Sequence, residues 1–548
     1  MQRRTVLKTM IGAAFIPVAA GCSSSSASSS SSTSSSSSAK TYSLTFDASS
    51  PTTLSKTVSV GGRSVTVKYK FYPNNVYVKN PVDYKYQSLN VSVPVEIDGK
   101  SIDASNAPIM FAINVGGYTS SSTYGATAQG GGTSSGNYGG GFSSGSSGSS
   151  SGAPSGSGAP SGSSGAASGA SSVGLGSSMG SSWTSYDNGE YALASGYVVI
   201  EPGCRGRDLK NSSGDYYGKA PAAIVDLKAA LRYVRHNTNI PGNKDWIITS
   251  GGSAGGALSA LVGASGNSAL YEASLTALGA ASADDNVFLS ACYSPITDLE
   301  HADGQYEWMW STLSLQSGSL NKTVSATLKE QFATYQSSLA LSGINGYGTL
   351  SADNYSAYMM KEYLIPGATN ALTNTLTSSE RSSYLAKNTW ITWSGSEASF
   401  TWADFLEHVG TRMKSAPAFD TFDLSAAENI EFGSATANAR HFTLYSLRHQ
   451  SGNSSSELDS DLPAKLNQMN PMYHLANKNS SRARHWWLRT GTLDTNTSHT
   501  VVCNLAAATS GLGDSVDSAL YWDGGHAVNY DAPDLFAWIK KLTGYSAS

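Results

Sequence analysis

The feature that most constrains this chain is a serine in a glycine-rich turn between a predicted strand and a predicted helix. Residues 251–255 form a G-x-S-x-G pattern directly after the apolar, strand-like run 246–249. A turn this sharp is strained, and small residues two positions before and after Ser253 avoid a clash, so that the serine Oγ stands above the end of the strand. The helix that follows brings backbone amides and a partial positive charge to the same place. The pattern therefore predicts a nucleophilic serine at position 253.

Strand and helix signals alternate on both sides of this turn. Alternating or continuous apolar runs predict strands at 58–60 and 65–71 around a Gly61-Gly62 turn, and then at 89–95, 109–113, 197–200, 246–249, 485–489 and 519–522. Helical spacing predicts helices over 222–235, from 254 onward and over 534–542. Alternating strands and helices are typical of a mostly parallel sheet covered by helices. We therefore expect an α/β-hydrolase fold, with Ser253 at its nucleophile elbow.

Two insertions interrupt this pattern. Residues 119–182 are rich in Gly and Ser, which make up 22 of the 30 residues from 141 to 170, and such a segment cannot bury enough apolar area to offset the entropy of ordering. It predicts a disordered loop inside the fold. Residues 299–478 have longer helical patterns without clear strand alternation, which predicts an inserted, mainly helical cap. The catalytic domain is then expected over 41–298 and 479–548.

The N-terminus has the features of an export signal. Residues 1–21 combine a basic start, an apolar stretch and small residues, and Arg3-Arg4 resembles a twin-arginine signal. Residues 19–22 resemble a bacterial lipobox, which predicts a lipid on Cys22, and the Ser-rich residues 22–40 predict a flexible tether. The alternative is an ordinary Sec signal followed by a chance cysteine. On the first interpretation the protein is a periplasmic or outer-membrane lipoprotein that contacts the membrane through Cys22.

Charge and cysteine content exclude several other classes. Charged residues make up 14% of the chain, the net charge is −4, and Lys and Arg are scattered, so that the clustered basic face of a nucleic-acid-binding protein is not expected. Four cysteines supply neither a disulfide framework nor a Cys/His metal spacing. No apolar run reaches the roughly 18 residues of a membrane span. We expect no metal, no other cofactor and no nucleic-acid partner.

A serine nucleophile needs a base that takes its proton and an acid that orients the base. In α/β-hydrolases these follow in the chain order Ser, Asp, His. His526 lies between the predicted strand 519–522 and the last helix, and Asp494 lies at the matching position after the strand 485–489. We therefore expect Ser253, Asp494 and His526 to be the catalytic residues. The alternatives are a loop-capping role for Asp494 and a surface position for His526.

Other acids and bases fit these roles less well. Asp523 is close to His526 in sequence but lies on the same loop, which makes it a weaker candidate for the acid. Four histidines fall in the predicted cap and are interpreted as structural or surface residues: His408, His441, His449 and His474.

The oxyanion that forms when a serine attacks a carbonyl needs two preoriented hydrogen-bond donors. One expected donor is the backbone N–H of Ala254, which follows the nucleophile. The other is the N–H of Gly117 or Tyr118, because the loop 114–118 follows a buried strand where this fold has its HGGG-type loop. Asn114 stands near the position of the usual histidine of that loop.

Several further segments resemble the bacterial tannase family, α/β-hydrolases that cleave galloyl esters, and the related feruloyl-esterase-like carboxylesterases. The resemblance runs from about residue 80 to the C-terminus except for the Gly/Ser loop, and its segments are 86–90, 203–207, 226–230, 250–256, 295–303, 470–473 and 491–494. It implies the same catalytic Ser253, Asp494 and His526. It also implies that Lys414 and Glu428 of the cap hold the hydroxyls of gallate. The third gallate-binding residue of the family is an aspartate, where this chain has the uncharged Asn496.

The sequence thus predicts a serine esterase that hydrolyses small carboxylic esters, of the phenolic galloyl type, through an acyl-enzyme on Ser253. A broad carboxylesterase, a feruloyl esterase and a serine peptidase share this set of residues and differ in the cap pocket. A surface binding protein with an inactive hydrolase fold is the alternative from another class. The complete set of Ser253, Asp494 and His526 argues against it, since an inactive descendant usually loses one of them.

Overall fold

The computed structural model describes residues 41–126 and 185–547. The predicted signal peptide 1–21, the tether 22–40 with Cys22, and residues 127–182 of the predicted Gly/Ser loop lie outside the described residues. Within the described part of the chain, no helix is both long enough and apolar enough to cross a membrane.

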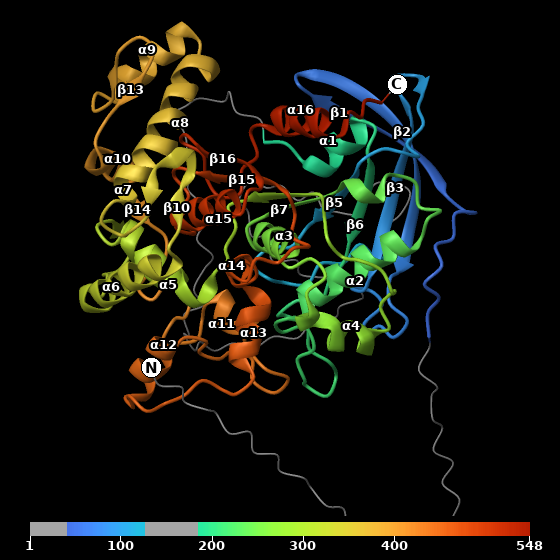
Figure 1. Cartoon of the computed structure of the whole chain (residues 1–548), viewed down its shortest axis with the longest axis horizontal. Helices are drawn as coiled ribbons and strands as arrows, with labels where there is room; N and C mark the ends of the chain where they lie inside the picture. Colours follow the sequence, from blue (N-terminus) through green and yellow to red (C-terminus); the bar gives the residue numbers. More distant parts are fainter. Residues whose placement is uncertain (1–40, 127–184, 548) are drawn as a thin grey trace, which may run out of the picture. The chain divides into compact units, whose positions relative to one another are not determined.

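A ten-stranded mixed sheet forms the centre of the fold (Figure 1). The strands lie side by side in the order β1, β2, β3, β6, β5, β7, β8, β15 and β16, and the short β4 pairs with β3. All pairs from β6 to β16 are parallel, whereas β1, β2, β3 and β6 pair antiparallel. The strands span Thr52–Val60 (β1), Arg63–Val76 (β2), Ser88–Ile97 (β3), Lys100–Ser101 (β4), Ile109–Ile113 (β5), Val198–Pro202 (β6), Ile247–Gly252 (β7), Leu289–Tyr293 (β8), His485–Gly491 (β15) and Ser515–Tyr521 (β16).

The central strands are apolar because both faces of the sheet are covered. Along β5, Ile109, Phe111 and Ile113 pack into one core, and Met110 between them packs into a second core on the opposite face. The first core contains side chains of α2, α3 and α15, and the second contains those of α1 and α16. The sheet and its two layers of helices confirm the expected α/β-hydrolase fold.

The helices around the sheet come from the parts of the chain before β8 and after α13, and α1 and α16 pack against each other (Figure 1). They span Asn188–Ala194 (α1), Ala222–His236 (α2), Ala254–Ala264 (α3), Glu272–Leu278 (α4), Pro471–Ala476 (α14), His499–Gly511 (α15) and Ala532–Thr543 (α16).

Between β8 and β15 the chain is mainly helical. It forms α5 (Leu299–Trp310), α6 (Lys322–Leu339), α7 (Tyr355–Met359), α8 (Ile365–Asn370), α9 (Ser378–Lys387), α10 (Trp402–Val409), α11 (Ala427–Glu431), α12 (Leu444–Ser451) and α13 (Leu462–Met469) before α14. Two-residue strand pairs join these helices, among them β9 (Ser314–Leu315) with β14 (Thr411–Arg412). Figure 1 shows this segment in yellow to orange, beside the β15–β16 part of the sheet.

Several boundaries differ from the sequence-based expectation. The first strand begins at Thr52, not at 58, and the second ends at Val76, not at 71. The last strand begins at Ser515, not at 519, because the first half of β16 is partly exposed at the edge of the sheet and its polar residues hide the strand pattern. The predicted loop 119–182 begins too early: Ser121 exchanges two backbone hydrogen bonds with Cys204 (3.0 and 2.8 Å), and Thr123 is buried. Residues 119–126 therefore belong to the fold.

Candidate active site

Ser253 lies between β7 and α3 in a backbone conformation that amino acids other than glycine rarely adopt. Its φ is 58° and its ψ is −123°, a strained combination that costs about 1–3 kcal/mol and persists only when the surroundings enforce it. A Cβ on Gly251 would lie 2.3 Å from the carbonyl oxygen of Gly255, and a Cβ on Gly255 would lie 2.6 Å from that of Ile113. Glycine is therefore required two positions on either side of Ser253.

The structure brings Ser253, His526 and Asp494 into one chain of hydrogen bonds. His526 Nε2 lies 2.9 Å from Ser253 Oγ, and His526 Nδ1 lies 2.8 Å from Asp494 Oδ2. Asp494 and His526 follow β15 and β16, which are parallel neighbours, so both strands deliver their side chains to the same edge of the sheet as β7. In this geometry a base can accept the serine proton while an acid holds the far side of its ring.

The surroundings of Asp494 favour its ionised form. Its carboxylate accepts hydrogen bonds from Asn496 N (2.9 Å), Asn496 Nδ2 (3.2 Å) and Thr490 Oγ1 (3.3 Å). Burial alone would raise the pKa of Asp494, but the His526 ring and the hydrogen bond from Asn496 N hold it below its usual range. An ionised Asp494 keeps a proton on His526 Nδ1, and this leaves Nε2 as the acceptor for the serine hydroxyl.

The loop 114–118 lies against the start of α3. Gly255 N donates to Val115 O at 2.9 Å, which holds the loop that contains the predicted donors Gly117 and Tyr118 against the first turn of α3, where the predicted donor Ala254 follows Ser253. Gly117 and Tyr118 both have positive φ values, 53° and 58°. The Tyr118 side chain is buried, and its hydroxyl donates to Ile296 O (2.7 Å), which fixes the loop from the other side.

Lys414 reaches the same site from the segment between β8 and β15. Its backbone N donates to Tyr306 Oη (3.1 Å), and Tyr306 Oη donates to Thr495 O (2.7 Å), next to Asp494. The ammonium group lies 3.7 Å from the centre of the Phe419 ring. Burial lowers the pKa of Lys414, and the carboxylates of Glu428, Asp303 and Asp494 oppose this shift.

Glu428 and Asn496 complete the set that the family resemblance singled out. Glu428 is buried on α11, and its charge acts on the phenol of Tyr118. Asn496 uses both its backbone N–H and its side-chain amide to donate to Asp494. An amide is favourable at this position because its N–H donates to the Asp494 carboxylate, whereas a second carboxylate at the same distance would repel it. All three residues thus lie around the Ser253–His526–Asp494 chain.

Asp523, the weaker candidate for the acid, binds side chains of the helical segment between β8 and β15. Its carboxylate accepts hydrogen bonds from His408 Nε2 on α10 (2.7 Å) and Tyr384 Oη on α9 (2.8 Å). The remaining histidines that were interpreted as structural or surface residues also have contacts of their own: His441 with Asp420, His474 with Tyr271 and His449 stacked on Phe422. No sequence signal connected α9 and α10 to the loop that bears His526, because that contact depends on tertiary packing.

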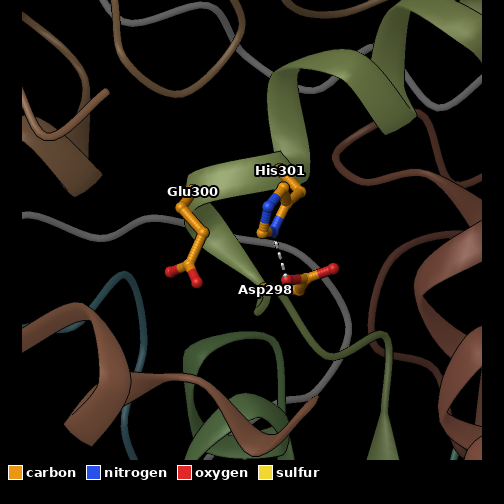
Figure 2. A group of neighbouring side chains, drawn as sticks. All are labelled: Asp298, Glu300 and His301. Carbon is orange, nitrogen blue, oxygen red and sulfur yellow. Dashed lines mark hydrogen bonds and ion pairs between the residues drawn. The ribbon is translucent and has the colours of Figure 1, made fainter. Parts of the chain in front are cut away.

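Within the described residues, one group of acids and histidine is close enough to be considered as metal ligands: Asp298, Glu300 and His301 (Figure 2). The Asp298 carboxylate already accepts four hydrogen bonds, from His301 Nδ1, Asn470 Nδ2, Gln305 Nε2 and Tyr335 Oη, at 2.5–3.0 Å. Burial lowers the pKa of His301, but Asp298 outweighs this and raises it. The cluster therefore joins α5, α6 and α14 as a hydrogen-bonded network in which the Asp298 carboxylate is already fully used.

Comparison with known proteins agrees with this geometry. The family model BD-FAE matches residues 180–342. Tannin acyl hydrolase from Lactobacillus plantarum is 33% identical, with 91% of this chain and 99% of that chain covered and a TM-score of 0.71. Fusobacterium nucleatum tannase is 32% identical, with 92% and 100% covered and a TM-score of 0.70. A tannin acyl hydrolase in complex with ethyl gallate gives 33% identity, the same 91% and 99% coverage, and a TM-score of 0.70.

A shorter match links the chain to a further esterase. Esterase LipQ of Mycobacterium tuberculosis is 39% identical over 90 residues, which cover 16% of this chain and only 20% of that protein.

The sheet, the elbow and the side chains at the ends of β15 and β16 define an α/β-hydrolase of the carboxylic ester hydrolase class. Within this class, the chain belongs to the bacterial tannase family.

The close approach at the elbow gives a direct test of its geometry. Replacement of Gly251 by alanine forces a methyl group against the Gly255 carbonyl and displaces Ser253. A displacement of 1 Å at a reacting atom costs about a hundredfold in rate, so the Gly251→Ala variant is expected to lose ester hydrolysis to that extent. Initial rates with 4-nitrophenyl acetate measure the loss.

Gly511→Ala is the matched control, because a Cβ at this exposed position at the end of α15 would meet nothing within 4 Å. It should retain full activity. Equal activity of the two variants would show that the elbow tolerates a larger residue at position 251 and would contradict the requirement for glycine there.

Proposed function

We propose that this protein is a serine esterase that hydrolyses phenolic, galloyl-type esters through an acyl-enzyme on Ser253. The observation that carries the proposal is the hydrogen-bonded chain of Ser253, His526 and Asp494, with Lys414 and Glu428 beside it. Ser253, His526 and Asp494 carry out the reaction. Lys414 and Glu428 bind the hydroxyls of the acyl ring.

The proposed reaction has two steps. In the first, His526 Nε2 takes the proton of Ser253 Oγ as the oxygen attacks the ester carbonyl, and the N–H groups of Ala254 and of Gly117 or Tyr118 stabilise the negative oxygen. The tetrahedral intermediate collapses, and His526 returns the proton to the leaving alcohol. In the second step His526 takes a proton from a water molecule as its oxygen attacks the acyl-serine ester. The bond to Ser253 Oγ then breaks, His526 returns the proton to Ser253 Oγ, and the carboxylic acid is released.

The acyl specificity is assigned to the charged side chains around the serine. A half-buried cation and a buried carboxylate can donate to and accept from phenol hydroxyls, and a site built on such groups rejects an acyl group that leaves them unpaired. A similar protein has been solved with ethyl gallate, and another structure contains 3,4-dihydroxybenzoate. Asn496 offers its amide oxygen as an uncharged acceptor, which favours a broader phenolic specificity than an aspartate would give.

Residues 299–478 are proposed to act as the cap of this active site. Lys414 and Glu428 both come from this segment, and His408 and Tyr384 bind it to Asp523, three residues before His526. The second candidate function, a broad carboxylesterase, rests on the Asn496 substitution and uses the same chemistry with less selection by the cap.

The specificity proposal is tested with two esters. Lys414→Met and Glu428→Gln are expected to lower hydrolysis of methyl gallate about ten- to hundredfold, the value of a hydrogen bond to a charged group, and to leave 4-nitrophenyl acetate nearly unaffected because it has no hydroxyls to bind. The measurement is kcat/KM on both esters, with Ser253→Ala as the blank.

Lys387→Met serves as the control, since Lys387 is an exposed lysine of the same segment. It should behave as the wild type on both esters. Parallel losses on both esters in the Lys414 and Glu428 variants would mean that these residues support the fold of the cap, and the galloyl assignment would fail.

The placement of the protein is proposed from the sequence alone: export and attachment to a periplasmic or outer membrane through a lipid on Cys22. In cells, Cys22→Ser is expected to move the protein from the membrane fraction to the soluble fraction, as followed by immunoblotting. An unchanged membrane fraction would contradict the lipid anchor.

A further inference from the structure

Residues 203–208, which we call the clamp segment, follow β6 and lie along the loop that is expected to form the oxyanion hole. Residues 203–207 also belong to the segments that resemble the tannase family. In the structure, the backbone bridge between Cys204 and Ser121 starts a close contact with residues 117–121. A Cβ on Gly206 would lie 2.1 Å from Ser120 N, so the two backbones touch and only glycine fits there.

Two consecutive residues of the clamp segment, Arg207 and Asp208, hold this loop with four hydrogen bonds. Arg207 Nε donates to Gly117 O (2.6 Å), and Arg207 N donates to Tyr118 O (3.0 Å). Asp208 accepts from Ser120 N (2.6 Å) and Ser120 Oγ (2.8 Å). Arg207 thus binds both carbonyl oxygens that flank the Cα of Tyr118, those of Gly117 and of Tyr118 itself.

The contact with Gly117 O fixes the direction of one particular N–H. The peptide between Gly117 and Tyr118 is trans, as the cis bonds of the described chain precede Pro221 and Pro417. In a trans peptide the C=O and N–H point in opposite directions. A Gly117 carbonyl that faces Arg207 therefore directs the Tyr118 N–H to the side away from Arg207.

The clamp segment is itself anchored to the body of the protein. Arg205 makes a bidentate ion pair with Asp226 of α2, in which Nε lies 2.9 Å from Oδ2 and Nη2 lies 2.8 Å from Oδ1. Both side chains are buried. The Arg205 backbone N–H also donates to Asp226 (2.9 Å). Because of this anchor, the position of Arg207 does not depend on the loop that it holds.

We propose that Arg207 is the positioning residue of the oxyanion hole. Its guanidinium turns the peptide between Gly117 and Tyr118 so that the Tyr118 N–H faces the oxygen of the tetrahedral intermediate on Ser253. It also polarises that peptide, since a hydrogen bond from a cation to the carbonyl strengthens the donor at the other end. The inference rests on the proposed function and goes beyond it, because it selects Tyr118 over Gly117 as the second donor and names the residue that aims it.

The test separates stabilisation of the transition state from general support of the fold. Arg207→Met should lower kcat for 4-nitrophenyl acetate about a hundredfold, the cost of one lost oxyanion donor, with KM unchanged. Affinity for phenylboronic acid, which forms a tetrahedral adduct with a nucleophilic serine, should fall by a similar factor. Affinity for gallate, a product without a tetrahedral centre, should be unchanged. Arg207→Lys keeps a cation and a donor and should recover part of kcat.

The control is Arg482→Met. Arg482 is a buried arginine that binds Asp514 and the backbone oxygen of Leu512 at the other end of β15 from Asp494. It should retain both kcat and affinity for the boronic acid. If Arg207→Met does not fold, Arg207→Lys decides by the same measurements.

Two results would overturn the inference: an unchanged kcat in the Arg207 variants, or equal losses of affinity for phenylboronic acid and gallate. These results differ from a failure of the proposed function. If the proposed function fails, the wild type and Ser253→Ala hydrolyse esters at the same rate. If ester hydrolysis depends on Ser253 but the Arg207 variants keep the wild-type kcat, only the role of Arg207 is refuted.

Discussion

The active site depends on the strained backbone of a single residue, Ser253. A φ of 58° at the end of β7 is tolerated because Gly251 and Gly255 allow the backbones around it to touch. The same close approach brings the loop after β5 against the start of α3, where Gly255 N binds Val115 O. The parallel order of β7, β8, β15 and β16 then brings Asp494 and His526 to the same edge of the sheet.

Electrostatics couple this core to the helical segment between β8 and β15. Asp494 is buried, its carboxylate accepts a hydrogen bond from His526, and its charge also acts on Lys414. Tyr306 connects the backbone of Lys414 to Thr495, so the residue proposed to bind substrate and the proposed acid share one hydrogen-bonded bridge. A change in the proposed cap therefore also affects the proposed catalytic acid, so specificity must be measured against an ester without ring hydroxyls.

Local patterns made much of this structure predictable. The buried strand 109–113 was predicted with its observed bounds, because all five residues are apolar and both faces of the sheet are covered. The order of serine, aspartate and histidine in the chain indicated three side chains that the structure places together. Contacts between distant segments cannot be predicted from such local patterns. The edge position of β16, the binding of Asp523 by α9 and α10, and the contact of Arg207 with Gly117 depend on tertiary packing.

The most direct test of the account is to identify the residue that carries the acyl group during turnover. The wild-type protein is mixed with methyl gallate, quenched in acid within milliseconds, digested and analysed by mass spectrometry. The account predicts a transient galloyl ester on the peptide that contains Ser253, which disappears as the substrate is consumed and is absent in Ser253→Ala. A galloyl group on another residue, or turnover at the full rate in Ser253→Ala, would contradict it.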